Sequence, residues 1–124
     1  MTLMVVADPV VSQDAKAVLN LDAGMLFAKN GHEALSFVKF MVFSVAVVDL
    51  DLPGESGFEL IRNIRAACPA LPIIAISGVY SKAMLESAKT VGAEEVLEKP
   101  VTPAWKPVVE RLRQKSLTQR AAGN

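Results

Sequence analysis

Several features that define whole classes of protein are scarce in this sequence of 124 residues. One cysteine, Cys68, excludes a disulfide within the chain and is typical of a reducing compartment. No apolar run is long enough to span a membrane, and the N-terminus shows no basic leader of a signal peptide. The 13 basic residues balance the 13 acidic ones, which argues against nucleic acid as a direct partner. We therefore expect a cytoplasmic protein that binds neither membranes nor nucleic acids.

Apolar residues, in contrast, are abundant: they make up 52% of the sequence, enough for one domain with a real core. They fall into short runs that alternate with helical patterns, which predicts a strand–helix unit repeated five times. Such alternation with short connections is typical of a parallel sheet with helices on both faces. The predicted fold class is therefore α/β, a doubly wound five-stranded parallel sheet. The expected strands are 3–7, 25–28, 45–49, 73–76 and 96–97. The first four expected helices begin near 12, 33, 58 and 82, and a fifth follows residue 102.

The end of the sequence is harder to interpret. Thr102 and Pro103 resemble the cap and first residue of a helix, but Pro107 inside that helix would remove a backbone hydrogen bond. The first turn is therefore kinked, or the regular helix begins near Pro107. Beyond Arg111 the residues are polar or small, which predicts a frayed end. We place one domain at 1–117 and a polar C-terminal tail at 118–124.

The central predicted strand ends in a carboxylate. Four apolar residues (45–48) run directly into Asp49, and such a run is typical of a strand buried on both faces. Pro53 and Gly54 then break the pattern before the next helix. Asp49 is thus predicted at the carboxyl end of a central strand, the edge at which ligands bind in open α/β sheets.

Polar residues also follow the other strands, namely Asp8, Ser77 and Lys99. Each alone has a plainer explanation: a turn at Asp8–Pro9, a strand-end cap at Ser77 and a solvated surface charge at Lys99. Together, at matching strand ends, they predict a shared site. Two neighbouring carboxylates repel unless a cation lies between them, and oxygen ligands with spare positions favour Mg²⁺. A hydroxyl and a lysine beside them suit a small anion such as a phosphoryl group.

Four segments of the chain resemble the signature segments of response-regulator receiver domains, the phospho-acceptor modules of two-component signalling. They follow one another with the order and spacing of that family, and together they span most of the chain. The segments are Asn-Gly-His-Glu-Ala-Leu (30–35), Asp-Leu-Asp-Leu-Pro-Gly-Glu-Ser-Gly (49–57), Ile-Ser-Gly (76–78) and Gly-Ala-Glu-Glu-Val-Leu-Glu-Lys-Pro (92–100). The resemblance implies a flavodoxin-like sheet in the strand order 2-1-3-4-5.

The resemblance also implies roles for the strand-end residues. Asp49 would accept a phosphoryl group from a histidine kinase or a phosphotransfer protein. Asp8, Asp49 and the backbone carbonyl of Asp51 would bind Mg²⁺, while Ser77 and Lys99 would contact phosphoryl oxygens. Phosphorylation would remodel the face formed by the fourth helix, fifth strand and fifth helix, where a downstream protein binds. The chain would then be a signalling domain rather than an enzyme, apart from slow autodephosphorylation.

The sequence departs from the family at several positions. The usual pair of acids after the first strand is Ala7–Asp8 here, which weakens the expected Mg²⁺ site. Asp51 adds a negative charge that either compensates at the metal or hinders an incoming phosphoryl group. Val96 replaces the aromatic residue that acts as a switch in the fifth strand. Trp105 is either a contact residue or part of the packing at the start of the last helix. The family's Lys-Pro step is cis, which we also expect at Lys99–Pro100.

Two alternatives remain open at this point. The first is a receiver-like interaction module that works without phosphorylation, as the changes at Ala7 and Val96 suggest. The second is a small phosphatase of the haloacid-dehalogenase type, in which Asp49 is the nucleophile and Asp51 the general acid. The chain is short for that fold and has no acidic pair after Lys99. The apolar segment 37–43 either adds to the core or forms an exposed interface, so a homodimer is also open.

Overall fold

A single parallel sheet forms the centre of the molecule. The computed structural model describes residues 1–21 and 24–123, with side chains described up to residue 119. The strands are β1 (Thr2–Val5), β2 (Met25–Ala28), β3 (Val45–Asp49), β4 (Ile73–Ser77) and β5 (Glu95–Glu98). Their order is β2-β1-β3-β4-β5 and every neighbouring pair is parallel, which confirms the predicted fold class and strand order.

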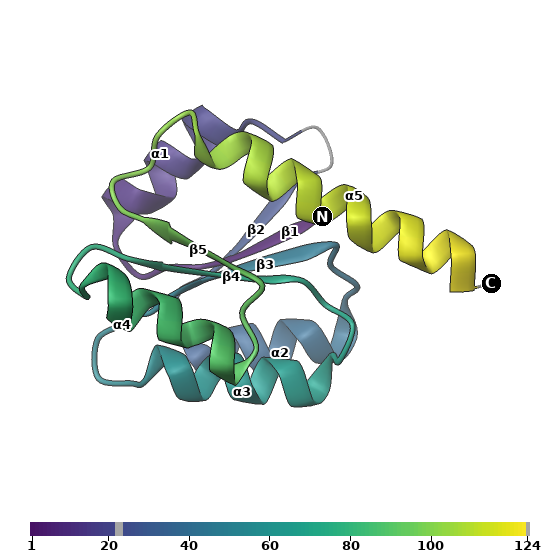
Figure 1. Cartoon of the computed structure of the whole chain (residues 1–124), viewed down its shortest axis with the longest axis horizontal. Coiled ribbons are helices and arrows are strands. Elements are labelled where there is room, and N and C mark those ends of the chain that lie inside the picture. Colours follow the sequence, from purple (N-terminus) through teal and green to yellow (C-terminus); the bar gives the residue numbers. More distant parts are fainter. Residues whose placement is uncertain (22–23, 124) are drawn as a thin grey trace.

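Helices cover both faces of this sheet. They are α1 (Pro9–Leu19), α2 (Gly31–Phe40), α3 (Gly57–Ala67), α4 (Lys82–Glu86), the short 3₁₀ helix η1 (Ser87–Val91) and α5 (Trp105–Gly123). Figure 1 shows α1 and α5 on one face and α2, α3 and α4 on the other. Each face has its own buried apolar cluster, and every residue of β3 and β4 is buried. The two-sided burial explains why these strands are continuous apolar runs.

Side-chain caps set the starts of the first four α-helices. Asp8, Asn30, Ser56 and Ser81 each accept a hydrogen bond from a backbone N–H in the first turn of the helix that follows. The starts predicted near residues 12 and 33 were therefore too late. Pro9 is the first residue of α1, where its missing N–H leaves no intrahelical bond unmade.

Helix α5 differs most from the sequence-based prediction. It begins at Trp105, so Pro107 lies in the first turn, where backbone N–H groups have no partner within the helix. The helix continues to Gly123, and Figure 1 shows its C-terminal part extending past the sheet. The prediction of a frayed end beyond Arg111 is therefore wrong, while the domain boundary at residue 117 stays a prediction. No helix among the described residues is both long and apolar enough to cross a membrane.

Burial resolves two open points about aromatic residues. Trp105 is 2% exposed and packs in the cluster between the sheet and α1 and α5, so it is a packing residue and its exposed-contact interpretation is wrong. The apolar segment 37–43 is partly core and partly exposed surface. Phe43 is buried against the opposite cluster, whereas Phe40 and Val42 are 85% and 72% exposed.

Candidate functional site

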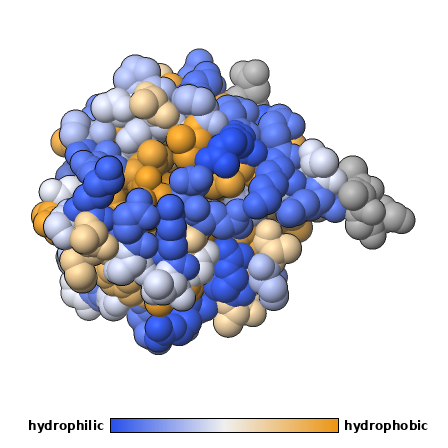
Figure 2. All heavy atoms as spheres, in the orientation of Figure 1, coloured by the Kyte–Doolittle hydropathy of each residue, from blue (hydrophilic) through white to orange (hydrophobic). Residues whose placement is uncertain are grey.

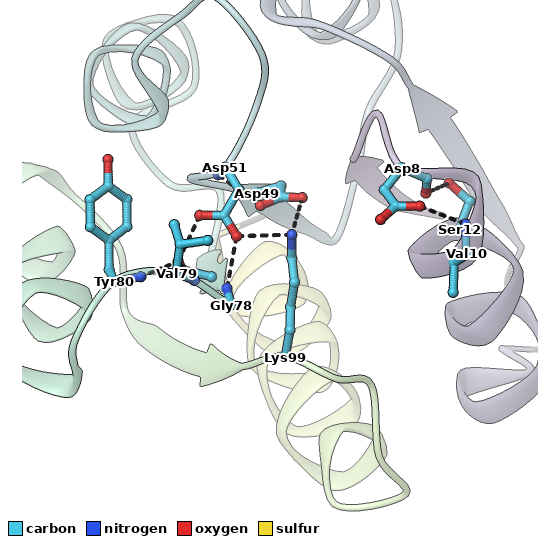
Figure 3. Close-up of polar contacts among 10 residues, drawn as sticks. Asp8, Val10, Ser12, Asp49, Asp51, Gly78, Val79, Tyr80 and Lys99 are labelled. Atoms are coloured by element: carbon cyan, nitrogen blue, oxygen red, sulfur yellow. Dashed lines mark hydrogen bonds and ion pairs between the residues drawn. The ribbon is translucent and has the colours of Figure 1, made fainter.

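Three of the four predicted strand-end residues lie together at the carboxyl edge of the sheet. Asp49 ends β3 and Ser77 ends β4, and both are 2% exposed. Lys99 directly follows β5, and the register pairs the ends of these strands with one another. Figure 3 shows Lys99 pointing toward Asp49, with Asp51 beside both. The topology alone brings these groups together, because parallel strands end at one edge.

Asp49 is a buried carboxylate with two donors. Its Oδ2 atom accepts a hydrogen bond from Lys99 Nζ at 2.7 Å, and its Oδ1 atom accepts one from the backbone N–H of Asp51 at 2.8 Å. Burial raises the pKa of Asp49, and the contacts with Lys99 and the Asp51 N–H offset this rise only in part. The ionised carboxylate is therefore destabilised by burial, and either an additional cation beside it or a covalent modification would reduce this destabilisation.

The Asp51 side chain makes contacts that the sequence analysis did not predict. Its Oδ1 atom accepts from Ser77 Oγ at 2.7 Å, and its Oδ2 atom accepts from Gly78 N at 2.7 Å and from Lys99 Nζ at 3.0 Å. Burial alone would raise the pKa of Asp51, but these three donors outweigh it and lower the value. The Asp-x-Asp spacing signals only the bond from the Asp51 N–H to Asp49, because an aspartate often accepts from the backbone N–H two residues on.

Lys99 is the shared cation of the two carboxylates. Burial alone would lower the pKa of Lys99, but the bonds to Asp49 and Asp51 outweigh it and raise the value. The ammonium therefore stays charged and bridges the two carboxyl groups. The aliphatic stem of Lys99 lies beside Gly78, and the peptide bond Lys99–Pro100 is cis, as the resemblance implied.

Asp8 is not part of this hydrogen-bonded cluster. Its side chain is exposed, and its Oδ1 atom accepts from Val10 N at 2.9 Å at the start of α1. Figure 3 shows Asp8 apart from the Asp49–Lys99 group, with its side chain accepting from Val10 N and its backbone carbonyl accepting from Ser12 Oγ. The structure thus gives Asp8 a helix-capping role, whereas the sequence analysis had considered it as a turn residue or a Mg²⁺ ligand.

The oxygen atoms near this edge suit Mg²⁺ chemically, although they are few. Among the described residues no group of three or more His, Cys, Asp and Glu side chains could hold a metal ion. Mg²⁺, however, keeps several waters and is often bound by one or two carboxylates. Asp8, Asp49 and the backbone carbonyl of Asp51 meet that requirement in number and type, so the residues present fit this ion.

The loop between β3 and α3 is packed tightly against the site. A Cβ atom on Gly57 would lie 2.6 Å from Leu50 Cα and 3.1 Å from the carbonyl oxygen of Asp49. The Oε1 atom of Glu55 accepts from Gly31 N at 2.9 Å and ties the same loop to the start of α2. These contacts fix the backbone that carries Asp49 and Asp51.

Comparison with known proteins agrees with this geometry. The family model of the response regulator receiver domain matches residues 3–105. A cyclic di-GMP phosphodiesterase of Thermotoga maritima is 28% identical over 103 residues, which cover 82% of this chain and 27% of that protein. The cell cycle response regulator CtrA of Brucella ovis is 24% identical over 99 residues, which cover 79% of this chain and 43% of CtrA. The chain thus spans less than half the length of these two relatives.

Solved structures give the same result. The chemotaxis protein CheY4 of Vibrio cholerae has 28% identity and a TM-score of 0.77, with 90% of this chain and 96% of that chain covered. The receiver domain of a putative LuxO repressor from Vibrio parahaemolyticus has a TM-score of 0.89 at 19% identity, with 99% and 96% covered, and shows the shared fold. On the match over residues 3–105 and this fold, the chain belongs to the response regulator receiver domain family.

Proposed function

We propose that this receiver domain accepts a phosphoryl group on Asp49 from the phosphohistidine of a kinase or phosphotransfer protein in the cytoplasm. The observation that carries the proposal is the buried Asp49 carboxylate, held 2.7 Å from Lys99 at the carboxyl edge of the sheet. The family accepts phosphoryl groups, and Asp49 is the buried acid at the end of the central strand.

In the proposed reaction, one carboxylate oxygen of Asp49 forms a bond to phosphorus while the bond from phosphorus to the histidine nitrogen breaks. The nitrogen keeps the electron pair of that bond, and the product is an aspartyl phosphate. Ser77, Lys99 and the Gly78 N–H donate hydrogen bonds to the phosphoryl oxygens. Catalysis then consists mainly of positioning and charge neutralisation.

Asp8, Asp49 and the Asp51 carbonyl are the residues that we propose to hold Mg²⁺. When bound, the ion supplies positive charge that offsets the negative charge of the carboxylates and the phosphoryl group. With one acid at Asp8 in place of two, we propose weaker binding of the ion than an acidic pair would give.

The downstream partner is proposed to bind the face formed by α4, β5 and α5. Val79 is 77% exposed at the approach to α4, and Met84 within α4 is 48% exposed. Figure 2 shows hydrophobic side chains reaching the surface between β5 and α5, surrounded by hydrophilic ones. Position 96 on β5 is a valine packed partly buried against the core, so no aromatic side chain can change rotamer there. The exposed Phe40 and Val42 lie elsewhere and are proposed as a second contact area, including one for a homodimer.

Phosphoryl acceptance is tested by replacing Asp49 with Asn. We expect the wild-type protein to gain the mass of one phosphoryl group with Mg²⁺ and phosphoramidate, measured by intact-protein mass spectrometry, and Asp49→Asn to gain none. Asp14→Asn is the matched control, because Asp14 is an exposed acid on α1, and it should react as the wild type does. An adduct that persists in Asp49→Asn would place the phosphoryl group on another residue.

The two roles of Asp8 are separable by two substitutions. Both Asp8→Asn and Asp8→Ala should weaken Mg²⁺ binding by about tenfold or more, because each removes a carboxylate ligand. Asn keeps the cap of α1, whereas Ala should lower the free energy of unfolding by about 1 kcal/mol. Calorimetric titration with Mg²⁺ and urea denaturation without it measure the two effects. Unchanged Mg²⁺ affinity in both variants would show that Asp8 is a helix cap only.

A further inference from the structure

The donors that a phosphoryl group on Asp49 would need are already occupied. Asp51 accepts from Ser77 Oγ, Gly78 N and Lys99 Nζ at 2.7, 2.7 and 3.0 Å. Lys99 Nζ bridges Asp51 and Asp49, so the Asp51 carboxylate lies directly beside the carboxylate that we propose to be modified. We call the position between Ser77, Gly78 and Lys99 the anion seat.

Almost every donor hydrogen at the anion seat already makes a hydrogen bond to a carboxylate. The Ser77 hydroxyl has one hydrogen, and its oxygen already accepts from the N–H groups of Val79 and Tyr80 at 3.1 Å each. Its hydrogen is therefore committed to Asp51. Gly78 has a single N–H, which also points to Asp51. Of the donors at the anion seat, only Lys99 has a hydrogen in reserve.

The contacts of Asp51 resemble those of a bound anion rather than those of a structural carboxylate. Its two oxygens receive three hydrogen bonds, from a hydroxyl, a backbone N–H and an ammonium group, which is the donor set that suits a phosphoryl group. The side chain is 14% exposed and belongs to the turn after β3. Residues 53–56, just beyond the buried Leu52, are exposed, so the turn that carries Asp51 lies close to solvent.

We propose that the Asp51 carboxylate occupies the anion seat in the unmodified protein and competes there with the phosphoryl group. Phosphorylation of Asp49 then requires Asp51 to leave, and Asp51 sets how readily the chain is phosphorylated. This inference rests on the proposed function of Asp49. The sequence analysis left a second role open for Asp51, which is to help bind the metal. Removing the carboxylate should slow phosphorylation if Asp51 helps bind the metal, and should speed it if Asp51 competes for the anion seat.

The first test measures the rate of phosphorylation in variants of Asp51. Asp51→Asn keeps the size of the side chain and removes its charge, and Asp51→Ala empties the anion seat. With phosphoramidate and Mg²⁺, both should gain the phosphoryl adduct about tenfold faster than the wild type, since a charged acceptor no longer holds the donors. Glu59→Gln, which neutralises an exposed acid on α3, controls for net charge and should leave the rate unchanged. Equal or slower reaction in both Asp51 variants would overturn the proposal.

The second test does not depend on chemistry at Asp49. Inorganic phosphate is titrated into the ¹⁵N-labelled protein while the Gly78 amide resonance is followed. Asp51→Ala should bind phosphate about tenfold more tightly than the wild type, with the shift centred on Gly78. An unchanged affinity would overturn the assignment of the anion seat. If phosphate binding improves but no variant gains an adduct, the anion seat is supported while the acceptor function of Asp49 fails.

Discussion

Replacing Lys99 with methionine is expected to impair both the chemistry and the stability of this domain. Methionine retains most of the apolar stem that packs beside Gly78 and removes the ammonium group shared by Asp49 and Asp51. The rate of phosphorylation should fall by about 10²–10³-fold, the usual effect of losing one donor to the transition state. The free energy of unfolding at pH 7 should fall by about 2–3 kcal/mol, because two neighbouring carboxylates lose their partner while most of their surface stays buried.

The pH dependence of this loss identifies its cause. Burial already raises the pKa of Asp49 above its ordinary value of 3.8, and removing Lys99 raises it further. An acid whose pKa is raised by folding destabilises the native state when it is ionised, and this penalty disappears as the group becomes protonated. The stability difference between Lys99→Met and the wild type should therefore be largest near pH 7 and should shrink as the pH falls toward 4.

Urea denaturation at a series of pH values measures this difference, and mass spectrometry measures the rate of phosphorylation. Lys29→Met is the matched control, because Lys29 is an exposed lysine in the loop before α2. It should change neither quantity. A stability loss in Lys99→Met that does not vary with pH would show that packing, rather than charge, is the main contribution of Lys99.

The sequence predicts the sheet and its edge well because a repeated physical pattern encodes them. Asp49 and Ser77 each follow a run of apolar residues that is buried on both faces, and alternating helices make the strands parallel. The place of each polar residue at the end of its own strand can thus be predicted from the few residues around it. Convergence at one edge follows from topology, without any knowledge of side-chain rotamers.

The contacts of Asp51 are not encoded locally. Its partners Ser77 and Lys99 lie 26 and 48 residues further along the chain, at the end of β4 and directly after β5. Whether the carboxylate turns toward them or toward a metal depends on the finished fold. Asp8 shows the same limit, because the sequence places it at a strand end but does not show that its side chain caps α1.

The phosphatase alternative can be judged from the fold. In that class of enzyme, the Asp-x-Asp motif stands near the start of the fold, whereas two full strand–helix units precede Asp49 here. The receiver-domain match also extends over residues 3–105. Asp51 donates no proton in this arrangement, since its lowered pKa keeps it ionised and three donors surround it.

Gly57→Ala is expected to be among the most damaging single-methyl changes near the site. Gly57 is the first residue of α3, and the new methyl group would lie 2.6 Å from Leu50 Cα and 3.1 Å from the Asp49 carbonyl oxygen. Both are backbone atoms, so no side-chain rotation relieves the overlap and the loop after β3 has to move. We expect the free energy of unfolding to fall by about 2–3 kcal/mol, the upper range for overpacking. Phosphorylation should slow as well, because the same backbone carries Asp49 and Asp51.

Gly31→Ala provides the matched control, since Gly31 also begins a helix and also has close neighbours. There the new methyl group meets the carboxylate end of Glu55, an exposed side chain that can rotate away, and Leu60 Cδ1 at 3.2 Å, a side-chain atom that has to give by only a few tenths of an ångström. The change should lower the free energy of unfolding by less than about 1 kcal/mol, because only one partly exposed hydrogen bond is lost. Thermal or urea denaturation of both variants measures the contrast. If the two variants lose the same free energy of unfolding, the backbone around Leu50 can move to accommodate the new methyl group. The loop that carries Asp49 would then be more deformable than its packing indicates.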